Sequence, residues 1–76
     1  MLFQTHNNIT VKAVEGAAEY FAEANEQGKG DVVMYPPDYI GGSVIQCCSS
    51  MDAAHKAAMR WQRKENRAVL KSKGQI

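Results

Sequence analysis

Apolar and polar positions near the C-terminal end of the chain repeat with the period of an α-helix. The apolar stripe recurs every three to four residues and consists of Met51, Ala54, Ala58 and Trp61. Such spacing, about 3.6 residues, places these side chains on one helix face. Ser50 is a good N-cap, because its hydroxyl can accept a hydrogen bond from the first turn. The pattern predicts a helix from residue 51 to about 67, followed by a frayed basic tail over 71–76.

A second stretch with helical spacing precedes the middle of the chain. Its apolar positions are Val14, Ala17, Ala18, Phe21 and Ala24, and its acidic positions are Glu15, Glu19, Glu23 and Glu26. The two sets fall on opposite faces of a helix. Gly28 is well placed to end that helix, since glycine is favoured just past a helix C-terminus. We therefore expect a helix over residues 14–27.

Shorter runs predict β-strands. Residues 31–35 are β-branched and aromatic and end at two prolines, and residues 43–48 follow two glycines. The segment between them fits a hairpin loop. Residues 9–13 alternate apolar with polar, as a half-buried strand does, and residues 2–5 are a candidate hairpin partner for them.

The order of these elements predicts an α+β domain with the topology β-α-β-β-α. The expected architecture is an antiparallel sheet with both helices on one face. Trp61 is then expected to be buried against the sheet, near Phe21 and Ile45. An alternative is α-β-β-α, in which residues 10–14 belong to the first helix, because Val11 also fits its spacing.

Length and composition limit the chain to one small domain, expected over residues 1–70. Of its 76 residues 45% are hydrophobic, but many of these are alanines, so the core must be thin. No apolar run approaches the ~18 residues of a membrane span, and the N-terminus has no export-signal pattern. These features exclude neither an enzyme nor a binding protein, but they predict no membrane partner.

The net charge of +1 hides a strong segregation of charge along the chain. Residues 1–54 hold two lysines and seven acids, whereas residues 55–76 hold seven bases and only Glu65. Six bases fall on the helix face opposite the apolar stripe, and four of them, Arg60, Arg63, Lys64 and Arg67, occupy about two turns of it. Guanidinium groups suit carboxylates and phosphates, so these four residues are candidate partner-binding residues. The simpler interpretation is a solvated face that keeps the protein soluble.

The loop from Tyr35 to Gly42 is the most distinctive segment. It combines Tyr35 and Tyr39 with two rigid prolines. Rigid aromatic side chains on a pre-organised loop are good binding anchors, which makes both tyrosines candidate partner-binding residues. The competing interpretation is that Tyr39 and Ile40 fold back and cap the thin core.

Cys47 and Cys48 are adjacent, which is not the spacing of a disulfide framework. They favour a reduced, cytoplasmic protein in which one thiol faces the core and the other faces the open side of the sheet. With His55 or His6 they match no zinc-binding spacing, so no metal and no cofactor is expected. A thiol activity that uses His55 as base lacks an orienting group and an oxyanion hole.

The sequence leaves three hypotheses for the function. The leading one is a small non-catalytic protein-interaction module that binds an acidic surface of a larger protein or complex. Regulators and inhibitors encoded by phages and mobile elements are often of this size and build, which is an analogy at the level of the fold. The second is nucleic-acid binding through the basic helix, and the third is the thiol activity. Complementary acidic and basic stripes would also make a homodimer physically easy.

Overall fold

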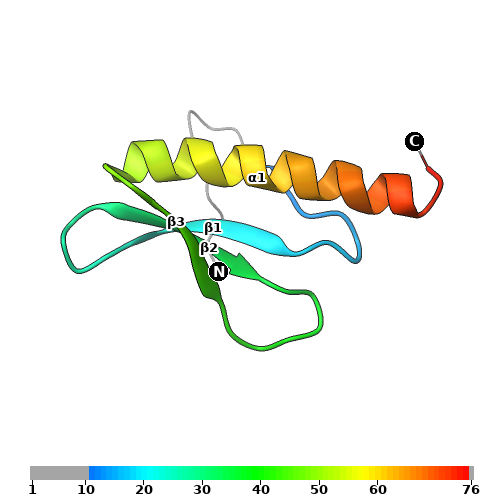
Figure 1. Cartoon of the computed structure of the whole chain (residues 1–76), viewed down its shortest axis with the longest axis horizontal. Coiled ribbons are helices and arrows are strands. Elements are labelled where there is room, and N and C mark those ends of the chain that lie inside the picture. The colour runs from blue at the N-terminus through cyan, green and yellow to red at the C-terminus, as the bar shows by residue number, and fades with distance from the viewer. Residues whose placement is uncertain (1–10, 76) are drawn as a thin grey trace.

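The computed structural model describes residues 11–75, which form a three-stranded antiparallel sheet covered on one face by a single helix (Figure 1). The strands are β1 (Glu19–Ala24), β2 (Gly30–Tyr35) and β3 (Ser43–Cys48), and the helix is α1 (Met51–Ser72). The α+β class predicted from the sequence is confirmed, and so are the two strands of the central hairpin and the C-terminal helix. The predicted topology with two helices is not.

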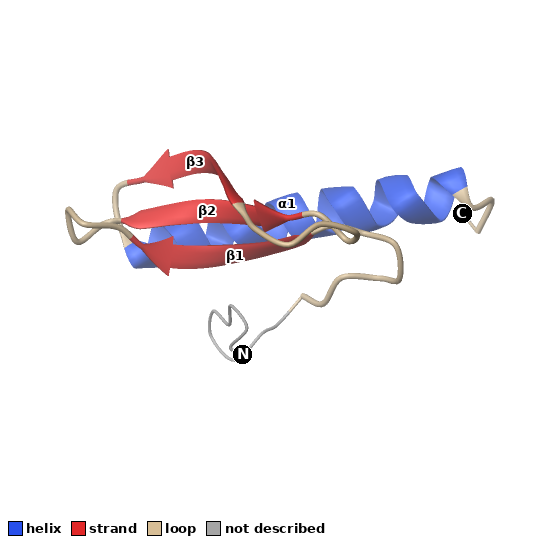
Figure 2. Cartoon of the chain, turned by 90° about the horizontal axis from the view of Figure 1, so that it is seen from below, coloured by secondary structure: helices blue, strands red, loops and turns tan. Residues whose placement is uncertain are grey.

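The sheet has the order β1-β2-β3, and α1 runs along it above β1 and β2, with β3 at the side (Figure 2). Tyr20 is paired with Met34 across β1 and β2, and Val32 is paired with Gln46 across β2 and β3. The register shifts after Val32, which places a bulge in β3. The core between the two layers is small and consists of Ala18, Tyr20, Val32, Ala57 and Ala58, with Met34, Ile45, Cys48 and Trp61 packed against it.

The segment predicted as a helix over residues 14–27 is instead a turn, the strand β1 and the start of a hairpin. Tyr20 points toward α1, while Phe21 on the other face packs edge-on against the Tyr35 ring of β2. A helix would have stacked Glu15, Glu19 and Glu23 at i,i+4 spacing, where like charges repel. In a strand the same spacing separates two side chains by about 13 Å, so the repulsion falls away.

The residues after β1 form a hairpin turn, where the sequence suggested a helix end. The Asn25 side chain accepts hydrogen bonds from the backbone N–H groups of Gln27 and Lys29, at 2.9 and 3.0 Å. Gly28 adopts φ +75°, a conformation that glycine reaches without strain. Asn25 therefore fixes the turn that joins β1 to β2, and Gly28 completes it.

The predictions for the N-terminal segment are tested only in part. Residues 11–13, the end of the strand predicted over 9–13, have no regular structure. The same residues are not helical, so the α-β-β-α alternative is also wrong. Residues 9 and 10, the hairpin strand at 2–5 and His6 lie outside the described residues.

α1 begins where the sequence indicates and extends farther than expected. Ser50 is the N-cap, and its hydroxyl accepts a hydrogen bond from the N–H of Ala53 at 3.1 Å. The helix continues past residue 67 and takes in Lys71 and Ser72 of the predicted tail. The Lys73 ammonium group then donates a hydrogen bond to the carbonyl of Glu15 at 2.7 Å. The last turns are thus held by the segment that leads into β1.

Three polar side chains of α1 hold that segment, residues 12–20, and we call them the polar clamp: Gln62, Glu65 and Asn66. Gln62 binds the backbone of Ala18 and Tyr20, and Glu65 accepts a hydrogen bond from the N–H of Ala18 at 3.1 Å. Asn66 accepts from the N–H of Val14 and donates to the carbonyl of Lys12. Glu65 also accepts a hydrogen bond from the Tyr20 hydroxyl at 3.4 Å. The clamp gives hydrogen-bond partners to backbone groups that would otherwise be left unpaired beside the core.

Candidate protein interface

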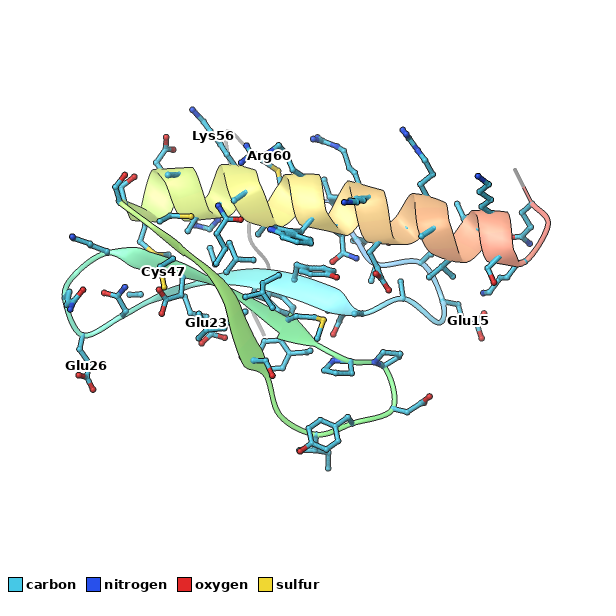
Figure 3. The ribbon with its side chains drawn as sticks, viewed as in Figure 1. Glu15, Glu23, Glu26, Cys47, Lys56 and Arg60 are labelled. Atoms are coloured by element: carbon cyan, nitrogen blue, oxygen red, sulfur yellow. The ribbon has the colours of Figure 1, made fainter. Side chains whose placement is uncertain are left out.

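The outer face of α1 carries a continuous basic stripe, which we call the basic face: Arg60, Arg63, Lys64 and Arg67. All four side chains are exposed. In Figure 3, Lys56 and Arg60 point away from the sheet. Lys56 pairs with Asp52 one turn away, at 3.5 Å. Within residues 11–75, no acidic side chain forms an ion pair with any of the four residues of the basic face.

The acidic residues lie on the sheet side of the molecule, and no acidic helix exists in residues 11–75. Glu19 and Glu23 are exposed on β1, and Glu15 and Glu26 lie in the segments before and after it. Figure 3 places Glu15, Glu23 and Glu26 below α1, on the side opposite the basic stripe. The segregation predicted from the sequence is therefore spatial, between the outer face of the helix and the sheet layer.

Trp61 joins α1 to the edge of the sheet. Its ring stacks on Tyr20 with a centroid distance of 5.8 Å, and its indole N–H donates to the Gln46 side chain at 2.8 Å. The Lys64 ammonium group lies 5.8 Å from the centroid of the same ring, within cation–π range. Trp61 is only half-buried, and Phe21, its expected neighbour, lies on the far face of the sheet. The expected contact with Phe21 is wrong, because the helix that would have carried Phe21 inward is a strand.

A shallow groove follows from this arrangement and lies between α1 and β3. It is lined by Gln46, Arg60, Trp61 and Lys64. Sequence reasoning missed the groove because it depends on a contact between side chains on different elements. Gln46 sits inside an otherwise apolar strand and was the available signal for it.

The two candidate tyrosines have different surroundings. Tyr35 is half-buried, and its hydroxyl donates a hydrogen bond to the Glu23 carboxylate, which raises the pKa of the Tyr35 phenol. Tyr39 and Ile40 project from the loop between β2 and β3, with exposed fractions of 70% and 97%. They do not cap the core. A Cβ atom on Gly42 would come within 2.7 Å of the Tyr35 ring, so this glycine lets the loop turn closely around it.

The tyrosines also border a broad hollow along β1. Its lining is aromatic and acidic near the β2–β3 loop, where Phe21, Tyr35 and Tyr39 lie with Glu19 and Glu23. His55 of α1 reaches the same hollow from the helix side. The loop and the basic face of α1 are therefore two separate surfaces, and the sequence-predicted binding residues do not form one cluster.

The two thiols lie on opposite faces of β3, and the described histidine lines the hollow along β1. Cys48 packs against the core and Cys47 is exposed on the other face of β3, as the alternation of strand side chains predicts. The Asp31 carboxylate beside Cys47 raises the pKa of that thiol, first by its charge and then by a hydrogen bond. Less of the reactive thiolate is therefore present at neutral pH. His55 lies toward β1, the opposite edge of the sheet from the thiols, and its Nδ1 has no hydrogen-bond partner in the described part of the chain.

In residues 11–75 no three His, Cys, Asp or Glu side chains are grouped so that they could hold a metal ion. Within the same range, α1 lacks the long apolar stretch that crossing a membrane requires. Comparison with protein-family models, with curated proteins and with solved structures finds no match to this chain.

Proposed function

We propose that this domain is a non-catalytic protein-interaction module whose basic face on α1 binds an acidic surface of a larger protein. The observation that carries the proposal is a row of exposed basic side chains with no acidic partner in residues 11–75. Lys56, Arg60 and Lys64 stand at i,i+4 spacing, where like charges oppose helix formation. An acidic partner would relieve that repulsion on binding and would steer association.

The size and build of the domain support the role of an accessory regulator or inhibitor of a larger complex. A single thin core leaves little volume for an enclosed active site, whereas the helix offers an exposed surface along its whole length. The exposed Tyr39 and Ile40 provide a second contact region of apolar character. Rigid aromatic residues of this kind are frequent energetic centres of protein interfaces.

Affinity capture with matched charge reversals tests the proposal. The basic-face variant replaces Arg60, Arg63, Lys64 and Arg67 with Glu, and the control variant replaces Glu19 and Glu26 with Lys. A protein captured by the parent and the control but not by the basic-face variant is the expected partner. Its binding to the purified domain should weaken steeply with salt, while thermal stability of the variants stays near that of the parent. Equal capture by all three proteins would refute the role of the basic face.

The length of the helix favours nucleic-acid binding as the second candidate function. α1 has 22 residues, which corresponds to about 33 Å, and its basic side chains extend over most of that length. Such a row can follow a phosphate backbone. Affinity of the purified domain for duplex DNA and RNA separates the candidates, because backbone binding needs no protein partner. A steep fall of that affinity between two salt concentrations would identify the phosphates as the target.

A further inference from the structure

β3 is an outer strand whose far edge pairs with no strand in residues 11–75. The pairing of the neighbouring hairpin determines which residues of β3 turn their backbone N–H and C=O groups outward. The backbone N–H of Asn25 donates a hydrogen bond to the carbonyl of Lys29 at 3.0 Å, so Lys29 directs its backbone groups toward β1. The direction alternates along β2, and Val32 therefore directs its backbone groups toward β3. Val32 is opposite Gln46, and the next residue, Cys47, therefore turns its N–H and C=O outward.

The outer edge of β3 has little of the protection that exposed strands usually carry. Proteins block such edges with charged residues, prolines or bulges. The sequence of β3, SVIQCC, has no charge and no proline, and within residues 11–75 its bulge is the one feature of this kind. β1, in contrast, bears Glu19 and Glu23, and the polar clamp of α1 binds the residues at its start. Among residues 11–75, the edge of β1 is therefore protected and the edge of β3 is exposed.

The groove between β3 and α1 determines which side chains a segment bound along this edge would contact. Arg60 and Lys64 of α1 line it together with Trp61 and Gln46, and the Lys64 ammonium group lies over the Trp61 ring. On the opposite face of the strand, Val44 is 55% exposed and Cys47 is exposed beside it. A strand added here would present one set of side chains to two cations and the alternate set to an apolar surface.

We propose that an extended segment of the partner protein, with acidic and apolar residues in alternation, adds to β3 as a fourth strand. Its acidic side chains would face Arg60 and Lys64, and its apolar side chains would lie against Val44. This proposal rests on the proposed function and specifies the form of the acidic partner. Backbone hydrogen bonds would provide affinity, and the alternation of side chains would provide selectivity.

Charge argues against a second copy of this chain as the occupant. Pairing of β3 with β3 would bring Arg60 and Lys64 of two copies to the same edge. Like charges so placed repel, and the strand itself contributes no acid to offset them. An acidic strand carries the opposite charge, so its carboxylates can pair with both Arg60 and Lys64.

A defined peptide tests the proposal directly. The probe is a peptide of alternating Glu and Val, blocked at both ends and about as long as β3. Titrated into the isotopically labelled protein, it should bind saturably and slow the hydrogen exchange of the Cys47 amide. The same peptide N-methylated at alternate residues loses the hydrogen bonds along one edge and should bind about tenfold more weakly or worse. A peptide with Lys in place of Glu should not bind.

Variants of the protein complete the test. Cys47→Pro removes the outward N–H and should abolish peptide binding, whereas Cys47→Ser keeps it and serves as the control. Equal affinity for the N-methylated and unmodified peptides would overturn strand addition, and so would absence of binding by the unmodified peptide. A dimer of the free protein with protected β3 amides would overturn it in favour of self-pairing. None of these results depends on the affinity capture with basic-face variants, so the two proposals fail separately.

Discussion

The side chain of Gln62 on α1 completes the edge of the sheet by accepting a hydrogen bond from the backbone N–H of Tyr20, at 2.9 Å. The same amide donates to the carbonyl of Ala18 at 2.8 Å and to Asn66 at 3.1 Å. Gln62 is only 3% exposed, so water cannot replace these bonds. A polar residue on the inward face of the helix therefore acts as a substitute for a neighbouring strand.

Replacing Gln62 with Leu should destabilise the domain by about 2 kcal/mol or more. The substitution keeps a similar volume but leaves the buried N–H of Tyr20 and carbonyl of Ala18 without partners, and an unsatisfied buried group costs about 1–3 kcal/mol. Urea unfolding followed by circular dichroism measures the change. Arg63→Leu on the exposed face is the matched control and should change stability by no more than about 0.5 kcal/mol. A Gln62→Leu protein as stable as the control would show that the hydrogen bonds of Gln62 contribute nothing to stability.

Trp61→Ala should cost about 2–3 kcal/mol, less than the loss of a fully buried aromatic residue. Trp61 is half-buried, and the substitution removes its stacking on Tyr20 and its hydrogen bond to Gln46. Trp61→Phe retains most of the stacking and should be intermediate. Thermal unfolding of the three proteins tests the order. Equal stability of the Ala and parent proteins would assign Trp61 to binding alone.

Gly30→Ala should destabilise the domain by about 1–3 kcal/mol, because β2 and α1 approach closely at this point. A Cβ atom on Gly30 would lie 2.6 Å from Cβ of Ala54 and 2.8 Å from the carbonyl oxygen of Ser50. Backbone cannot move aside as a flexible side chain can. Chemical denaturation measures the loss, with Ser43→Ala at the exposed start of β3 as the control. An unchanged midpoint for Gly30→Ala would mean that the helix can shift away without cost.

Asp31→Asn should accelerate alkylation of Cys47 at a fixed pH near 8. The Asp31 carboxylate raises the pKa of the Cys47 thiol by its charge, and the neutral amide removes that charge. The pKa should fall, and the thiolate fraction should rise. Rates of reaction with iodoacetamide across pH, measured in a Cys48→Ala background, give the pKa of Cys47 alone. A pKa that stays the same or rises in the Asn variant would contradict the assigned cause.

Tyr39→Ser and Ile40→Ser should each change the free energy of unfolding by less than about 0.5 kcal/mol. Both side chains project into solvent, so neither contributes to the core. The same substitutions would weaken partner binding if the loop is a contact region. Thermal unfolding distinguishes the two roles, since a large loss of stability would restore the interpretation that this loop caps the core.

The C-terminal half of the fold was predictable because its local signals agree with one another. Ser50 offers a cap, the alanines repeat with helical period, and residues 43–48 have strong β character. The exposure of the basic face follows from the same period, since Arg60 and Arg67 stand opposite the buried alanines. These inferences need no knowledge of distant contacts.

The prediction for the first half of the chain was wrong because its alanine- and glutamate-rich stretch fits both the period of a helix and the period of a strand. Phe21 fits a helical stripe, yet Tyr20 beside it supplies the larger buried side chain once the segment is extended. Asn25 and Gly28 were the signals of a hairpin turn. The polar clamp and the Gln46–Trp61 contact depend on tertiary structure. Glu65, an acid on the apolar side of the predicted helix, was the signal for the clamp, and Gln46, a polar residue in an otherwise apolar strand, was the signal for the contact.

The polar clamp also determines when the sheet can be finished. Its hydrogen bonds join residues separated by 42 to 54 positions, from Tyr20 with Gln62 to Lys12 with Asn66. Synthesis proceeds from the N-terminus, so the residues of β1 and β2 are made before those of the clamp. Contacts of such long sequence separation carry a large loop-closure cost and slow folding. The edge of β1 can therefore be completed only after the fourth turn of α1 has formed and docked.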